Sequence, residues 1–179
     1  MQGIEHLVRY SKILLFLFFS LNCVFAKGYP NKTVDALIKT GINNVLNQNY
    51  SSAKEKFKML EQQFPKLPFG KIYLAITDIA ESVDFGERFN DDYVYKLLKD
   101  ARHLSDSLYD ADEKDLWSNY FMALSDGYYA YFKGMNGDYL TAITNGISSI
   151  SYYEKCIDID SLFYDSYIAL GTYYYWKSA

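Results

Sequence analysis

The fold is decided by residues 153–174, which read YEKCIDIDSLFYDSYIALGTYY. Apolar and small side chains recur in it every three or four residues, with a break at Asp160 and Ser161, and this period is that of an α-helix. The stretch therefore predicts the end of one helix, a tight turn and the first turns of the next helix. The packing positions that it supplies are Tyr153, Cys156, Tyr167, Leu170 and Gly171, with Tyr174 one turn later.

A second stretch, near the amino terminus, shows the same arrangement of small and large residues. A helical period runs over residues 34–46, residues 47–49 form a turn, and Ser51 or Ser52 caps a second helix that Pro65 ends. Small side chains are expected where the two paired helices approach closely. The packing positions of this unit are Leu37, Gly41, Ala53, Phe57 and Pro65.

Both stretches resemble the tetratricopeptide repeat, a helical hairpin of about 34 residues. Residues 153–160 are similar to the junction between two such repeats, and the ending Gln62-Gln63-Phe64-Pro65 looks like that of exported family members from the bacterial envelope. The resemblance implies an all-α fold of antiparallel hairpins stacked as a right-handed superhelix or bundle. It also implies a module that binds a protein or peptide, and it transfers no catalytic residue.

The rest of the chain brings the expected helices to about seven. A third helix starts at Pro68 and a loop follows at residues 83–90, after which helices are predicted at residues 91–108, 117–132, 139–158 and 163–177. Residues 82–137 do not follow the repeat pattern, so the middle of the fold is expected to be irregular. In the helix at 139–158, small residues three or four apart would let another helix come close; they are Ala142, Gly146 and Ser149.

Residues 1–26 have the composition of a secretory signal peptide. Arg9 and Lys12 precede an apolar run at residues 13–19, and Ala26 suits cleavage before Lys27. This pattern predicts export to the periplasm or out of the cell. Two alternatives stay open: an uncleaved amino-terminal membrane anchor, and lipidation at Cys23. The expected organisation is a signal peptide at residues 1–26, a linker at 27–33 and a helical domain at 34–179.

The charge balance is mildly acidic, with 18 Lys and Arg against 22 Asp and Glu and a formal net charge of −4. Proteins that bind nucleic acid or anionic membrane surfaces gather basic residues on one face, and no such cluster occurs in this sequence. We therefore expect no nucleic-acid partner. Contact with a membrane is expected only through an uncleaved signal anchor or lipidation.

Few residues suit catalysis or metal binding. His103 and Cys156 are lone residues of their kinds after residue 26, and the sequence holds neither a paired cysteine motif nor a glycine-rich phosphate loop. The acidic run at 110–115 lacks the glycine and distal glutamate of a calcium loop. The sequence thus predicts no enzyme, no cofactor and no metal site. Cys156 is expected to pack in the core, with a reactive thiol as the alternative.

Aromatic residues exceed what a single core stripe needs, and 19 of them are tyrosines. Consecutive aromatics at 128–132 and 173–176 point all round their helices, so some are expected on a groove wall or an interface, where tyrosine combines a large area with a polar tip. The alternative is a thick aromatic core between hairpins. The candidate groove or interface residues are Tyr128, Tyr131, Phe132, Tyr173, Tyr174 and Trp176.

The leading functional hypothesis is therefore an exported scaffold that binds a protein or peptide without catalysis. The alternative is a small-ligand or glycan receptor that uses a tyrosine-rich groove, similar to the tetratricopeptide subunits that accompany solute transporters. The helix at 163–177 starts a hairpin that the sequence does not complete. We expect either that the chain is a fragment of a longer repeat protein or that this helix docks on another chain, a second copy included.

Overall fold

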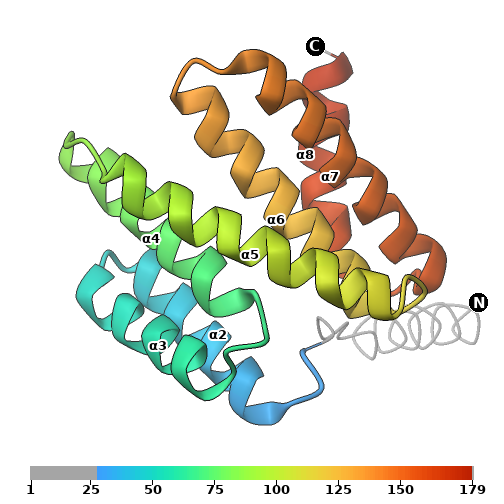
Figure 1. Ribbon diagram of the computed structural model, residues 1–179, viewed down its shortest axis with the longest axis horizontal. Helices are drawn as coiled ribbons and strands as arrows, with labels where there is room; N and C mark the ends of the chain where they lie inside the picture. Colours follow the sequence, from blue (N-terminus) through green and yellow to red (C-terminus); the bar gives the residue numbers. More distant parts are fainter. Residues whose placement is uncertain (1–27, 179) are drawn as a thin grey trace, which may run out of the picture.

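The computed structural model describes residues 28–178, apart from the side chain of Trp176. Within this part every regular element is a helix, and the prediction of an all-α fold with about seven helices is confirmed. The predicted signal peptide, with Cys23, and Ala179 lie outside the described residues. The helices, drawn in Figure 1, are α2 (Lys32–Leu46), α3 (Tyr50–Gln63), α4 (Phe69–Phe85), α5 (Asp91–Ala111), α6 (Leu116–Met135), α7 (Tyr139–Ile159) and α8 (Tyr164–Ser178).

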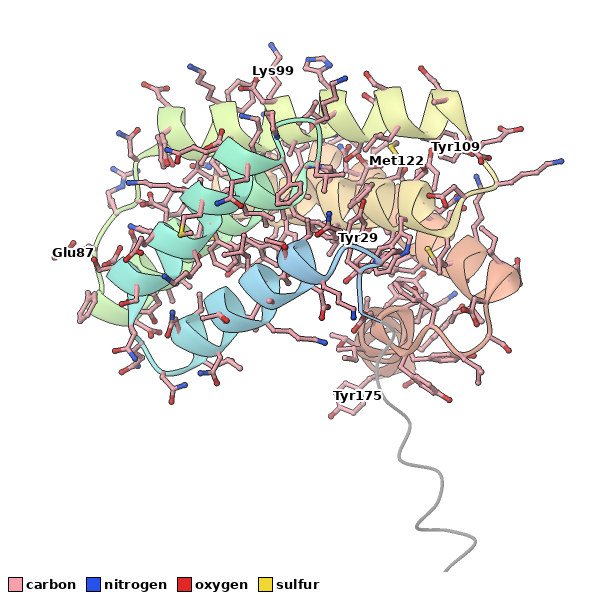
Figure 2. The ribbon with its side chains drawn as sticks, turned by 90° about the horizontal axis from the view of Figure 1, so that it is seen from below. Tyr29, Glu87, Lys99, Tyr109, Met122 and Tyr175 are labelled. Atoms are coloured by element: carbon pink, nitrogen blue, oxygen red, sulfur yellow. The ribbon has the colours of Figure 1, made fainter. Side chains whose placement is uncertain are left out.

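Each helix packs against the next one along the chain, and α4 also contacts α2 and α6. The described residues thus form a stack of helical hairpins, α2 with α3, α4 with α5 and α6 with α7, followed by α8 (Figure 1). Figure 2 shows α2 and α8 on one side of the molecule and α5 on the other, where Lys99 points into solvent. This arrangement leaves α2, α4, α6 and α8 to line a common face.

Side-chain caps fix where most helices begin. Asn31 accepts hydrogen bonds from the backbone nitrogens of Thr33 and Val34, and Asp115 accepts one from that of Ser118 at 2.8 Å. Two expectations about helix ends were wrong. The helix α3 begins at Tyr50, directly after Asn49, so Ser51 and Ser52 lie inside it and neither caps it. The helix α4 continues through Phe85 into the expected loop at 83–90. It ends only where Gly86 adopts a left-handed conformation, with φ of 67°, which glycine tolerates best.

The stretch at 27–33, expected to be a linker, is partly packed. The Tyr29 ring meets Trp117 edge-on at a centroid distance of 4.9 Å and Phe69 at 5.4 Å. In Figure 2 Tyr29 lies where the chain enters α2. The segment before α2 thus packs on the core formed by α4 and α6. Its glycine and proline content predicts a linker and gives no sign of this packing.

The contact between α6 and α7 is the most extensive in the described chain, and small residues make it possible. A Cβ added to Gly134 would lie 3.7 Å from the Cβ of Ala142, and one added to Gly127 would lie 2.8 Å from the Oγ of Ser149. Ser149 also donates a hydrogen bond to the carbonyl of Ala123 at 2.7 Å. The close helix approach expected from the small residues of α7 is therefore confirmed.

A buried charge network ties α5, α6 and α7 together. Arg102 donates from Nε to Oδ1 of Asp126 at 3.0 Å, and Ser148 donates to Oδ2 at 2.6 Å, so both oxygens of this buried carboxylate have partners. The guanidinium lies over the Tyr129 ring, 4.5 Å from its centroid. A paired and hydrogen-bonded carboxylate escapes the desolvation cost of an isolated buried charge.

The amino-terminal packing positions fit together around Phe57. Ala53 and Phe57 are fully buried, and a Cβ added to Gly41 would lie only 2.3 Å from a carbon of the Phe57 ring. Leu37 is half-buried, and Pro65 follows the end of α3 on the surface. Glycine at position 41 is therefore what allows α2 to lie against α3.

The carboxy-terminal packing positions divide into buried and exposed ones. Tyr153, Cys156 and Leu170 are buried, whereas Tyr167 and Gly171 are exposed. A Cβ added to Gly171 would meet no atom within 4 Å. The small position of the last unit thus has no helix packed against it among the described residues.

The two glycines at matching repeat positions give a first prediction. We expect Gly41→Ala to destabilise the protein by about 1–3 kcal/mol, because the new methyl group overlaps a buried ring. Gly171→Ala should instead stabilise it by about 0.5–1 kcal/mol, the gain in helix propensity at an open site. Urea denaturation of the two variants and the wild type measures both changes. Equal effects in the two variants would contradict this packing.

Candidate binding groove

Two cavities hollow the face lined by α2, α4, α6 and α8. The first, of about 490 Å³, lies between α2 and α4 on one side and α6 and α8 on the other; the second, of about 570 Å³, lies between α6, α7 and α8. The two cavities are adjacent, and four residues line both. We call the whole depression the tyrosine groove, and the shared residues are Leu124, Tyr128, Tyr153 and Ala169.

The walls of the tyrosine groove expose large apolar side chains to solvent. In the second cavity Ile143 and Ile147 are each 61% exposed and Tyr131 is 53% exposed. In the first cavity Ile168 of α8 is 73% exposed. Apolar side chains gathered in a hollow, unlike single ones scattered over a surface, mark a place where another molecule binds.

Four tyrosines from three helices converge on the first cavity: Tyr73 from α4, Tyr120 and Tyr128 from α6, and Tyr153 from α7. Tyr120 and Tyr153 meet edge-on at a centroid distance of 6.2 Å, and Tyr73 stacks on Phe57 at 5.0 Å. Burial raises the pKa of all four phenols, so they stay protonated and neutral at physiological pH. Tyr73 stacks on Phe69 as well, and Tyr153 is buried, so the four residues line the cavity as neutral aromatic groups rather than as charges.

Asp165, in the first turn of α8, lines the same cavity and is the one charged side chain of its described lining. Within residues 28–178 its carboxylate has neither a hydrogen bond nor an ion pair, since the neighbouring Lys39 pairs with Asp35 at 2.8 Å. Burial raises the pKa of Asp165; the charge of Lys39 opposes this rise and that of Asp35 adds to it. The groove thus holds a half-buried carboxylate without a described partner.

The aromatic residues proposed from sequence separate into three groups. Tyr128, Tyr131 and Tyr173 line the tyrosine groove. Phe132 is buried in the core beside α5, where its ring meets that of Tyr95, so it offers no surface to a ligand. Tyr174 lies on the outside of α8 and donates to a carboxylate oxygen of Glu154 at 2.6 Å. The side chain of Trp176 lies outside the described part of the structure.

Sequence reasoning missed several residues of the groove: Tyr73, Tyr120, Ile143, Ile147 and Asp165. The tyrosines sit singly in ordinary helical periods, and Asp165 reads as an acidic residue at a helix start. These residues share a cavity only because α8 lies beside α2 and α6. The spacing of neighbouring residues in the sequence does not predict this arrangement.

Other chemistry was sought across residues 28–178. No three histidine, cysteine or acidic side chains gather there in a way that could hold a metal ion. His103 is exposed, and in the acidic run Asp112 and Asp115 bond to nearby backbone nitrogens. None of the described helices combines the length and the apolar character needed to cross a bilayer.

Comparison of the sequence with protein-family models gave no match, and comparisons with curated proteins and with solved structures gave none either. The function is therefore inferred from the residues and from the geometry of the groove.

Cys156 should be an unreactive thiol. It is fully buried, donates to the carbonyl of Leu116, and burial raises its pKa to about 12. With Cys23 replaced by Ser, we expect a disulfide reagent near pH 8 to modify Cys156 at least about a thousand times more slowly than a free thiol, because the thiolate is so scarce. Absorbance of the released thiol, with urea-unfolded protein as the reference, measures the rate. Fast modification of the folded protein would restore the reactive-thiol alternative.

Asp165 gives a pH-dependent prediction. Because its pKa is raised on folding, the folded protein holds this proton more tightly than the unfolded chain, and stability falls as the pH rises through the interval between the two pKa values. We therefore expect Asp165→Asn to be more stable than the wild type near pH 7. The difference should vanish near pH 3, below both pKa values. Urea denaturation at the two pH values tests this.

Asp92→Asn serves as the control, because Asp92 is exposed and lies in the first turn of α5, as Asp165 does in the first turn of α8. This variant should be no more stable than the wild type at either pH, because it only removes a favourable charge at a helix amino terminus. If Asp165→Asn is instead less stable than the wild type near pH 7, the carboxylate has a stabilising partner and our view of its environment is wrong.

Proposed function

We propose that this chain is an exported, tetratricopeptide-like scaffold that binds a peptide or protein segment in the tyrosine groove, without catalysis. The observation that carries the proposal is that two adjacent, largely apolar cavities share four lining residues on one face of a helical stack. A groove of this kind holds an extended or helical segment through several apolar anchors at once.

The arrangement of the helices supports the proposal. Tetratricopeptide repeats present the first helix of each hairpin to a common binding face, and here α2, α4, α6 and α8 line the face that carries the groove. The sequence resemblance lies in the units that flank the groove, at residues 37–65 and 153–174. Both the order of the helices and the sequence pattern support the proposal of an interaction module.

The composition of the groove favours a peptide over a compact polar ligand. Its exposed side chains are aliphatic or aromatic, and the tyrosine hydroxyls supply dispersed polar contacts of the kind found at protein interfaces. The signal-peptide pattern of residues 1–26 supports a place of action in the periplasm or outside the cell.

A peptide-selection experiment tests the function. The purified chain is immobilised and presented with a displayed library of random peptides of about 16 residues, the length of a helix that fills such a groove. We expect bound peptides with apolar residues at helical or alternating spacing, and saturable binding when they are synthesised and titrated by fluorescence polarisation. A chain that retains none of these peptides would overturn the proposal, and saturation by oligosaccharides instead would support the receptor alternative.

Matched variants locate the binding. Ile147→Ser removes an exposed apolar wall of the groove and should weaken binding of a selected peptide about ten-fold, with stability nearly unchanged. Val83→Ser is the control, because Val83 is a similarly exposed aliphatic residue at the far end of α4 that does not line the groove. Equal losses in both variants would show that the peptides bind elsewhere.

A further inference from the structure

We propose that the segment held in the tyrosine groove carries a basic side chain, lysine or arginine, whose charge lies against Asp165 within the ring of Tyr73, Tyr120, Tyr128 and Tyr153. This inference rests on the proposed function and names the chemistry that the groove selects. The first cavity is lined by all five residues, which come from four different helices.

The first argument is the state of Asp165. Its carboxylate is half-buried on the wall of an apolar cavity, and no described side chain donates a hydrogen bond to it or forms an ion pair with it. The nearby positive group, Lys39, is already paired with Asp35. By contrast, the buried carboxylate of Asp126 has a partner for each oxygen. A half-buried charge that has no hydrogen-bond or ion-pair partner among residues 28–178 is a place where a ligand of opposite charge gains most.

The second argument is the aromatic surroundings. A cation over a tyrosine ring is attracted by the negative ring face, and the attraction grows when water is excluded. The chain uses such contacts elsewhere: Arg102 lies over Tyr129 at 4.5 Å and Lys155 over Tyr152 at 4.6 Å. Within the described residues no lysine or arginine lies over the four rings of the groove. Those rings therefore stand beside a carboxylate without a cation of their own.

The third argument is the route into the site. Aliphatic residues of the first cavity, Ile42, Leu124 and Ile168, border the tyrosines. Lysine and arginine have long methylene stems that pack on apolar surface while the charged head reaches a polar group. A basic side chain entering across these residues would bury its stem and bring its head to Asp165. A free metal ion or a compact polar ion gains nothing from that apolar lining.

The experiment uses the peptides selected on the wild-type chain. In each, every lysine and arginine is replaced in turn by norleucine, which keeps an unbranched apolar stem and removes the charge. We expect one replacement per peptide to weaken binding about ten-fold or more on the wild type. On Asp165→Asn the same replacement should weaken binding by no more than about three-fold, because the carboxylate is gone and only the attraction of the rings remains. Asp92→Asn should behave as the wild type.

Variants of Tyr128 measure the contribution of its ring to binding separately from that of the Asp165 carboxylate. Tyr128→Leu keeps apolar area but removes a ring face, and should weaken binding of the basic peptide about three-fold or more while leaving the norleucine peptide nearly unaffected. Tyr128→Phe keeps the ring face and should restore most of the difference in affinity between the basic peptide and the norleucine peptide. Circular dichroism and urea denaturation of each variant confirm that it is folded before affinities are compared.

The outcomes separate this inference from the function on which it rests. If no peptide binds, the proposed function fails. If peptides bind, but without basic residues or with equal affinity for the wild type and Asp165→Asn, the groove is a peptide site that does not select a cation and this inference is overturned. Selection of acidic peptides would overturn it as well.

Discussion

The close approach of α6 to α7 is the constraint on which the rest of the structure depends. Glycine, alanine and serine face one another along this contact, so two long helices lie nearly backbone to backbone. One face of α6 is thereby committed to α7, which leaves its remaining faces for α5, through Arg102 and Asp126, and for the groove, through Tyr120 and Tyr128. Larger residues at the contact between α6 and α7 would displace α7 and α8 together and change the shape of the tyrosine groove.

Much of the fold could be predicted because its signals are local. Helical periods, capping residues and the small residues of α7 each act within a few turns, and they locate seven helices and one close contact. Other expectations failed. The helix α4 ends at Gly86, later than the neighbouring residues suggest, and Tyr29 packs on a core formed by residues far along the chain. Long-range packing of that kind leaves no trace in the spacing of nearby residues.

The groove was only half predictable for a related reason. A run such as Tyr131-Phe132 turns consecutive rings by about 100° around the helix, so one faces the groove and the other the core. When both faces of a helix contact apolar surroundings, composition cannot say which ring goes where. Asp165 and Tyr73 are separated by about half of the chain and share a cavity only because α8 lies beside the first hairpins.

The carboxylate of Asp165, which has no partner among the described residues, also links the stability of the folded protein to the proposed ligand. A ligand that binds the folded chain and neutralises this charge raises the free energy of unfolding, whereas the empty protein unfolds more often and meets proteases more often. The amount of the protein in its compartment would then follow the supply of the segment that it binds. Under the proposed function, the abundance of the protein would then depend on whether its partner is present.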